Sequence, residues 1–209
     1  MSKRARALSE IPEGVEWNDW GPAVRVRVDH GAVALFARAV KDRSDVYASA
    51  RAAREAGFAQ VPAPPTFTFV MAHSGAFADL QPEGSTGSMY ADNPTAAAGG
   101  TGLYLHGEQH FTYHRPVVVG DVLEGRLRTS KPIAREARRG PMEVTYFQTR
   151  WSDLDGTPVL IHDETVDRTT DGKGQVAEIA ACLSLNVVQS VEVRQPNVEP
   201  SAVSLRATR

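Results

Sequence analysis

The sequence predicts an α+β domain in which an antiparallel sheet packs around one buried helix. Residues 67–80 are apolar on nearly every face of a helix, which is typical of a helix wrapped by other elements. After residue 104, hydrophobic residues follow a period of two in four successive segments, as in antiparallel strands. The sequence has no alternation of strands with helices and no glycine-rich phosphate loop, so we do not expect a parallel nucleotide-binding sheet.

The composition is that of one ordinary globular domain. The 209 residues are 42% hydrophobic, which is enough to form a core, and a net charge of −2 with mixed signs does not suit a nucleic-acid binder. No segment reaches the ~20 apolar residues that cross a bilayer. No apolar run follows the basic start, so a secretory signal is not expected either. The single cysteine, Cys182, fits a reducing compartment, and we expect a cytoplasmic protein.

The first elements are a strand and two helices. Valines at 24, 26 and 28 alternate with arginines, which predicts a half-buried strand. Asp29 is a favourable N-cap for a helix that continues to about Val40. A second short helix is predicted between Ser49, as its cap, and Gly57, as its end.

The long central helix is predicted over Phe67–Leu80. Prolines up to Pro65 prevent an earlier start, and Thr66 is suited to cap this helix. Residues 81–103 are rich in Gly, Ser, Pro and Ala, and a run of this length without structure is typically a lid, a partner contact or a disordered segment. We expect it to cover a binding site.

Four strands are predicted to follow as an antiparallel meander. They are residues 107–114, 121–131, 142–151 and 158–168. The pair Asp155–Gly156 is a hairpin signal, and 115–121 and 133–141 are expected to be turns because of their Gly and Pro. The domain is expected to span residues 1–168. An extension over 169–209 would contain a last strand or short helix and an arm.

Three histidines, His106, His110 and His114, are spaced by four residues. On a helix or on a strand this spacing puts them on one face. The aromatic and β-branched residues 111–113 favour a strand, with Phe111 and Tyr113 on the opposite face. Four residues of strand span about 13 Å, too far for ligands of one zinc ion, so no metal site is predicted.

Several stretches together resemble a known family. They are "FARAVKDRSDVYASARAAREAGF", "VPAPPTFTF", "LHGEQHFTYHRPVVVGDVLEG" and "RRGPMEVTYFQTRWSDLDGTPV", within residues 20–168. They resemble the MaoC-like dehydratases and (R)-specific enoyl-CoA hydratases, in the N-terminal, FAS1-like dehydratase type. The resemblance implies a single hot-dog fold, a curved antiparallel sheet wrapped around one central helix.

The resemblance implies hydration of trans-2-enoyl thioesters, or the reverse dehydration of 3-hydroxyacyl thioesters. Coenzyme A or acyl carrier protein would be part of the substrate, and no separate cofactor is implied. Complete members carry an Asp and a His in a D-x-N-P-x-H loop. Here Asp42 matches the aspartate, but Tyr47 stands at the histidine position. A tyrosine is a poor base at neutral pH. We therefore expect an acyl-thioester-binding subunit, paired with a catalytic MaoC-like chain in a heterodimer or heterotetramer.

The resemblance and the acid–base residues that the sequence offers together supply the candidate site residues. The catalytic candidates are Asp42, Tyr47 and His106, and the substrate-binding candidates are Pro65, Thr66, Gly107, Glu108, Gln109, His110 and Arg115. Basic clusters at 3–6 and 135–139 are weaker candidates for contacts with nucleotide phosphates, since surface charge explains them equally well.

Three alternatives stay open. A self-sufficient homodimeric hydratase would have to use other acid–base groups, namely Asp42, His73, His106, Glu108 and His110. A thioesterase on the same fold, or a binding module without chemistry, is also compatible with the sequence. In every case an edge strand that needs cover predicts a dimer or larger assembly.

Overall fold

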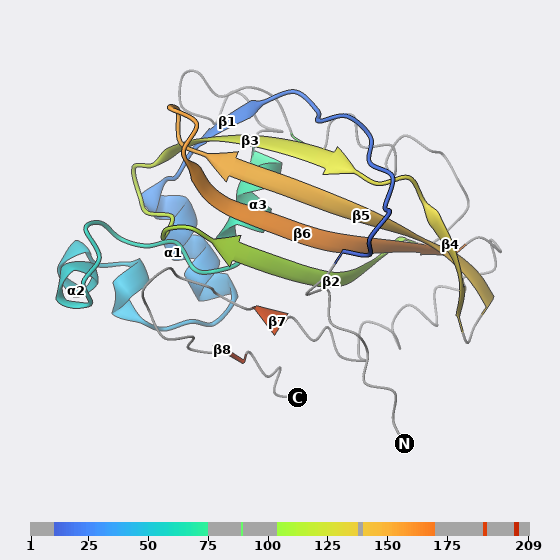
Figure 1. The fold of residues 1–209 in the computed structure, drawn as a ribbon. Coiled ribbons are helices and arrows are strands. Elements are labelled where there is room, and N and C mark those ends of the chain that lie inside the picture. Colours follow the sequence, from blue (N-terminus) through green and yellow to red (C-terminus); the bar gives the residue numbers. More distant parts are fainter. Residues whose placement is uncertain are drawn as a thin grey trace.

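A computed structural model describes residues 11–74, 89, 104–137, 140–169, 190–191 and 203–204. Its main feature is a six-stranded antiparallel sheet (Figure 1). The strands are β1 (Val24–Arg27), β2 (Tyr104–Tyr113), β3 (Val122–Thr129), β4 (Ile133–Ala137), β5 (Gly140–Ser152) and β6 (Pro158–Thr169). The helices are α1 (His30–Ala39), η1 (Asp45–Tyr47), α2 (Ala50–Glu55) and α3 (Phe67–Ser74). Figure 1 shows α1 and α3 on the same side of the sheet. The predicted α+β class is confirmed.

The local predictions for the N-terminal half are confirmed. Oδ1 of Asp29 accepts hydrogen bonds from the amides of Gly31 and Ala32, and α1 begins at the next residue after this cap. Oγ of Ser49 likewise accepts from the amide of Ala52 at the start of α2. Gly57 follows α2 with a φ of +89°, a left-handed conformation that ends the helix.

The strand order differs from the predicted meander. The order is β1-β3-β5-β6-β2, with β4 paired to β5, so β2 lies beside β6 and not beside β3. The prediction of a simple meander is wrong at this connection. The loop after β2 instead pairs with the segment before α3, where Ala63 N donates to Val117 O and Val119 N donates to Val61 O, both at 2.8 Å. The alternation of apolar and polar residues identifies a strand, but it does not determine which other strand pairs with it.

The predicted turn over 133–141 is also wrong for most of its length. Residues Ile133–Ala137 form β4, which pairs with the start of β5, and Arg135 Nη2 donates a 2.7 Å hydrogen bond to the hydroxyl of Tyr146. Gly140 and Pro141 already belong to β5. By contrast, the predicted hairpin at Asp155–Gly156 joins β5 to β6, with Gly156 at a φ of +88°.

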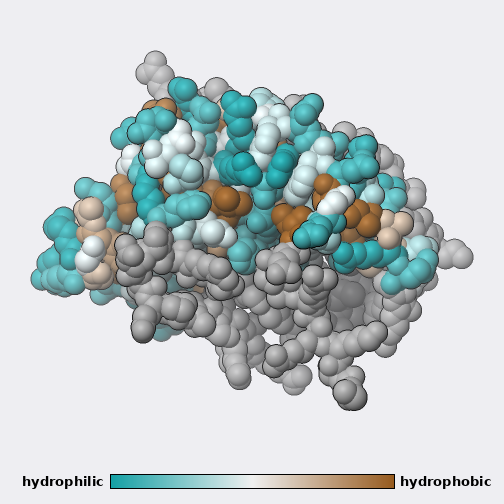
Figure 2. All heavy atoms as spheres, viewed as in Figure 1, coloured by the Kyte–Doolittle hydropathy of each residue, from teal (hydrophilic) through white to brown (hydrophobic). Residues whose placement is uncertain are grey.

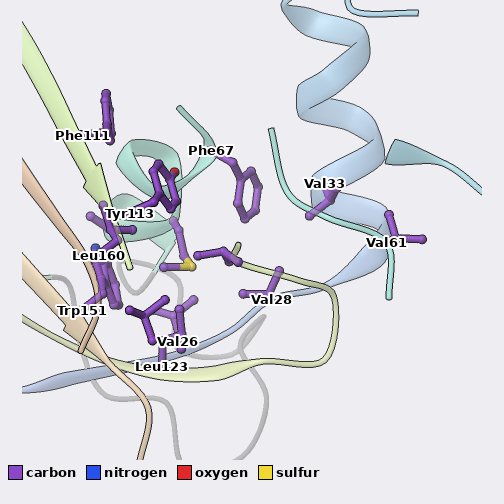
Figure 3. Close-up of a cluster of buried hydrophobic side chains, with 14 of the residues drawn as sticks. Val26, Val28, Val33, Val61, Phe67, Phe111, Tyr113, Leu123, Trp151 and Leu160 are labelled. Carbon is purple, nitrogen blue, oxygen red and sulfur yellow. The ribbon is translucent and has the colours of Figure 1, made fainter. Parts of the chain in front are cut away.

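The core lies between the sheet and the helices. Side chains from β1, β2, β3, β5, β6, α1 and α3 meet there with almost no exposed surface (Figure 3). Its largest members include Phe111, Leu123, Trp151 and Leu160. The residues of β2 and β6 that face α3 therefore form the floor under that helix.

Helix α3 is buried on one side only. Phe67, Met71 and Ala72 are buried, whereas Val70 is 40% exposed. The second half of the predicted central helix, from residue 75 to Leu80, lies outside the described residues. Within the described residues, α3 thus packs against the sheet with one side and leaves Val70 exposed on the other.

The opposite face of the sheet carries mostly hydrophilic residues, with smaller hydrophobic patches between them (Figure 2). Residues 17–21 run alongside β3, where Asn18 N donates to the carbonyl of Thr129. The guanidinium of Arg128 lies over the rings of Trp17 and Trp20, at 4.2 and 4.6 Å from the ring centroids. Arg128 also donates to Oε1 of Gln148. These contacts hold the N-terminal segment on the sheet and leave the helix-facing side for a site.

Several predictions fall outside the described residues. Cys182 and the basic cluster at 3–6 do so entirely, as does the expected lid over 81–103 apart from Met89, which packs partly buried against the core. In the C-terminal extension, β7 (Ser190–Val191) and β8 (Val203–Ser204) pair with each other.

Candidate functional site

The loop after α1 carries the two residues that the family resemblance marks as catalytic. Asp42 N donates to the carbonyl of Ala37 at 2.9 Å as α1 ends, and Asp42 Oδ1 accepts from Ser44 N at 2.9 Å. This side-chain turn leads directly into η1, whose last residue is Tyr47. Asp42 is exposed and Tyr47 is half-buried. Tyr47 lines a pocket next to this loop, and Asp42 lies close enough for its charge to act on the Tyr47 phenol.

The pocket next to this loop is apolar and has a volume of about 120 Å³. Its lining includes Val46, Tyr47, Phe58, Ala63, Pro65 and Tyr113. Pockets that enclose drug-sized ligands measure about 300–1,000 Å³, so only part of an acyl thioester fits here. Pro65, a predicted binding residue, thus lines the same pocket as Tyr47.

Two tyrosines in this pocket have perturbed acidities. Burial, together with the charge of Asp42, raises the pKa of Tyr47. Burial raises the pKa of Tyr113 further, and its hydroxyl donates a 2.5 Å hydrogen bond to the carbonyl of Pro65. Both phenols therefore stay protonated at neutral pH. They can donate hydrogen bonds, but they cannot act as bases there.

Strand β2 contains a β-bulge. In the register with β6, His106 is opposite Val166 and Gln109 is opposite Glu164, so two residues of β2 face one residue of β6. The amide of Glu108 donates a 2.9 Å hydrogen bond to Oγ1 of Thr165, which fixes the bulge. A Cβ atom on the neighbouring Gly107 would collide with the same oxygen.

The bulge reverses the alternation of side chains along β2. His106 consequently lies on the face of β2 that points to α3, on the same side as Gln109. His110 is opposite Asp163, on the other face of the sheet. The prediction that the three histidines share one face is wrong for His106, because an even separation preserves the face only in an unbroken strand.

The inner face of β2 and β6 carries a second polar cluster. His106 Nδ1 lies 3.7 Å from Oε2 of Glu164, and Gln109 Nε2 donates a 3.3 Å hydrogen bond to the same oxygen. Glu164 is 2% exposed, whereas His106 is 61% exposed. The ring of Phe69 packs edge-on against His73 and His106, with centroid distances of 5.0 and 5.7 Å.

The pocket and this cluster lie at opposite ends of α3. Pro65, which accepts the hydrogen bond of Tyr113, comes just before the helix, and His73 is in its last turn. A helix of eight residues is about 12 Å long. His106 is therefore not brought to Asp42 and Tyr47, the other two predicted catalytic candidates.

The remaining candidates are Arg115, just after β2, and Thr66, just before α3. Arg115 Nη1 is 2.7 Å from Oδ2 of Asp121, and it also donates to the carbonyl of Pro116. The carbonyl of Thr66 accepts a hydrogen bond from Phe69 N in the first turn of α3. Arg115 thus stabilises the loop that follows β2.

Glu164 and Tyr113 were not among the predicted site residues. Glu164 has a signal in the sequence, since it occupies an inward position of β6 between the buried His162 and Val166. An acidic residue where the alternation requires apolar ones marks a carboxylate with a specific partner. Tyr113 has no such signal, because a buried tyrosine fits the alternation equally well.

Sequence comparison assigns the family. Residues 19–162 match the family described as FAS1-like, dehydratase domain region. The chain belongs to this FAS1-like dehydratase family. A UPF0336 protein of Saccharopolyspora erythraea is 28% identical over 151 residues, which cover 71% of this chain and 85% of that protein. A UPF0336 protein of Clavibacter michiganensis is 41% identical over 96 residues, covering 46% of this chain and 56% of that protein.

Solved structures share the fold of this FAS1-like dehydratase chain. The C-terminally truncated HadBC complex, a 3R-hydroxyacyl-ACP dehydratase from Mycobacterium tuberculosis, has a TM-score of 0.53 at 23% identity and covers 75% of this chain and 99% of that chain. The ChsH1-ChsH2 complex from the same organism has a TM-score of 0.56 at 18% identity, with coverages of 72% and 84%. The predicted hot-dog fold is confirmed.

Two further observations concern the described part of the FAS1-like dehydratase chain. No cluster of three or more His, Cys, Asp or Glu side chains within it is arranged to hold a metal ion. None of its helices has the length and apolar character needed to cross a membrane.

Proposed function

We propose that this chain is the acyl-thioester-binding subunit of a two-chain enzyme. The enzyme would hydrate trans-2-enoyl thioesters or, in reverse, dehydrate 3-hydroxyacyl thioesters. The observation that carries the proposal is Tyr47, a half-buried phenol with a raised pKa at the position where complete relatives have a histidine. Hydration needs a base that accepts a proton near neutral pH, and a protonated phenol cannot be that base.

A partner chain of the MaoC-like type would bring the missing Asp and His. HadBC and ChsH1-ChsH2, which share the fold, are both complexes of two chains, and this supports the proposal of a heterodimer or heterotetramer over a homodimer. Val70 of α3 is 40% exposed, and a second hot-dog subunit that packs against α3 would cover it.

The pocket at Tyr47 supports the binding role. Its apolar lining suits the acyl chain or the pantetheine arm, and the phenolic hydroxyl of Tyr47 can donate a hydrogen bond to a thioester oxygen. The carrier would be coenzyme A or acyl carrier protein, without a separate cofactor. We place the enzyme in the cytoplasm, since a single cysteine fits a reducing compartment.

The test is hydration of trans-2-butenoyl-CoA by the purified chain, by a co-purified MaoC-like partner, and by their complex. We expect full turnover only in the complex, and a loss of about 10²-fold or more when the partner's catalytic histidine is replaced by alanine. Full activity of the lone chain would overturn the subunit role. Release of free coenzyme A by the complex, without hydration, would identify a thioesterase instead.

Pocket-filling variants test the binding role separately. Ala63→Trp and Val46→Phe should raise KM in the complex, because both side chains line the pocket beside Tyr47. Leu35→Trp is the matched control, since Leu35 is 68% exposed on α1 and does not line the pocket. An unchanged KM in both pocket variants would exclude this pocket as the acyl site.

A further inference from the structure

The carboxylate of Glu164 is buried at a place where the fold would ordinarily put an apolar side chain. It is 2% exposed and belongs to the face of β6 that packs under α3. An isolated buried carboxylate is costly, so such a group requires hydrogen bonds or an opposite charge. Gln109 supplies one hydrogen bond, and the imidazole of His106 is positioned to supply a positive charge when protonated.

The imidazole of His106 combines contact with this buried carboxylate and access to solvent. Its Nδ1 faces Glu164 at 3.7 Å, which is longer than a hydrogen bond but within ion-pair range. The ring is 61% exposed, so water and a substrate can reach it. A carboxylate on one nitrogen favours the tautomer that leaves the other nitrogen as a base, and such contacts often shorten when substrate binds.

The β-bulge in β2 places His106 on the inner face of the sheet. Without the bulge at Gly107 and Glu108, the alternation of β2 would put His106 on the outer face with His110. Thr165 holds the bulge through its hydroxyl, and only glycine fits at 107 beside that hydroxyl. Bulges next to active sites commonly re-aim one side chain, and here that side chain is an imidazole.

Aromatic rings complete the surroundings. Phe69 of α3 contacts His73 and His106, and its ring also lies 5.9 Å from that of the buried His162. Partial burial, with a smaller effect of the charge on His106, lowers the pKa of His73. The two exposed imidazoles thus lie beside an aromatic wall at the C-terminal end of α3, where an acyl chain would find apolar contact.

We propose that His106 is an acid–base group of this chain and that Glu164 is the residue that positions it. Together they would form a second site, separate from the loop of Asp42 and Tyr47. The proposal rests on the proposed function for its substrate class, an acyl thioester. It extends that function, because a chain that lacks the family's histidine would then still contribute chemistry of its own.

The reaction at this site balances without another reactant. Neutral His106 takes a proton from water through Nε2 while the water oxygen bonds to C3 of the enoyl thioester. The π electrons of the C2–C3 bond move into the thioester, which becomes an enolate. The imidazolium then gives the same proton to C2, and the other hydrogen of water stays on the new hydroxyl. Glu164 stabilises the imidazolium and remains a carboxylate throughout.

The first experiment does not depend on turnover. The isolated chain is treated with diethyl pyrocarbonate, with and without saturated butyryl-CoA, and modification of each histidine is measured by mass spectrometry. We expect butyryl-CoA to protect His106 and not His114, which is exposed at the end of β2. Loss of this protection in the pocket variant Ala63→Trp would assign it to the Tyr47 pocket and overturn the second site. Absence of protection in the unaltered chain would overturn it as well.

The second experiment uses the complex in which the partner's catalytic histidine is replaced. We expect a remaining hydration activity that His106→Ala lowers by about 10²-fold and His114→Ala leaves unchanged. Glu164→Gln should lower kcat and leave KM unchanged, since a positioning role acts on proton transfer and not on binding. If no hydration activity remains in this complex, the proposal is overturned. It is also overturned if His106→Ala leaves the remaining activity unchanged. If the complex without any substitution shows no hydration activity, the proposed function is refuted instead. The diethyl pyrocarbonate experiment would then test the second site by itself.

Discussion

The hydroxyl of Tyr113 donates a 2.5 Å hydrogen bond to the main-chain carbonyl of Pro65. This contact joins β2 to the residue just before α3, across the floor of the apolar pocket. Tyr113 is 6% exposed, and Pro65 is half-buried. The hydrogen bond thus fixes the position of the start of α3 relative to the sheet.

We expect Tyr113→Phe to lower the free energy of unfolding by about 0.5–1.5 kcal/mol, because it removes the hydrogen bond to the half-buried Pro65 carbonyl. Urea unfolding followed by circular dichroism would measure the change. Tyr146→Phe is the control, since its hydroxyl accepts from the exposed Arg135 and its loss should cost less. Equal losses in the two variants would contradict a special role for the Pro65 contact.

The bulge in β2 provides a prediction about Gly107. We expect Gly107→Ala to destabilise the protein by about 1–3 kcal/mol, because the new methyl group collides with Oγ1 of Thr165. The collision disappears in a Thr165→Ala background, where the nearest remaining side-chain atom is Cβ at 3.4 Å. A double-mutant cycle by urea unfolding checks this. If Gly107→Ala costs the same in both backgrounds, the hydroxyl does not determine the choice of glycine.

The turn after β2 depends on Asp121. Its Oδ2 accepts a 2.7 Å hydrogen bond from Arg115 and a 2.9 Å hydrogen bond from the amide of Val118. We expect Asp121→Ala to lower the midpoint of thermal unfolding, with a loss of about 1–3 kcal/mol. Arg115→Ala should cost less, because the Val118 hydrogen bond survives. A larger loss for Arg115→Ala would show that the arginine has another partner.

Stability should depend on pH through His162. Burial, together with the charges of His106 and His110, lowers the pKa of His162 to about 3. The unfolded chain binds this proton near pH 6.5, so between about pH 6.5 and 3 the unfolded state holds more protons and stability falls as the pH decreases. At about 1.4 kcal/mol per pKa unit, the full effect is on the order of 5 kcal/mol.

Urea unfolding of the unaltered chain and of His162→Leu at several pH values from 7 to 4 would test this. The variant should lose much of the pH dependence, whatever its stability at pH 7. The control is His114→Leu, because His114 is exposed and its substitution should leave the slope intact. An unchanged slope in His162→Leu would mean that carboxylates, and not His162, cause the acid sensitivity.

The local elements of this protein could be predicted because each depends on residues close in the chain. Asp29 and Ser49 cap their helices through amides two or three residues away, and Gly156 turns a hairpin by its own backbone conformation. The alternation of Val24 and Val26 with arginines likewise needs only a sheet with one buried face. Only the resemblance, and not these patterns, led to Asp42 and Tyr47.

The candidate sites required the tertiary structure. Period two defines the face of a residue only while the pairing register is unbroken, and Thr165, distant in sequence, is what breaks it at Gly107. The same register brings Glu164 to His106. The sequence by itself thus determined the fold class and most elements, through short-range periodicity and capping. Only the tertiary structure decided that β2 lies beside β6 and which side chains share a site. These contacts join segments that are distant in the sequence, and the residue pattern of one segment does not indicate which other segment it contacts.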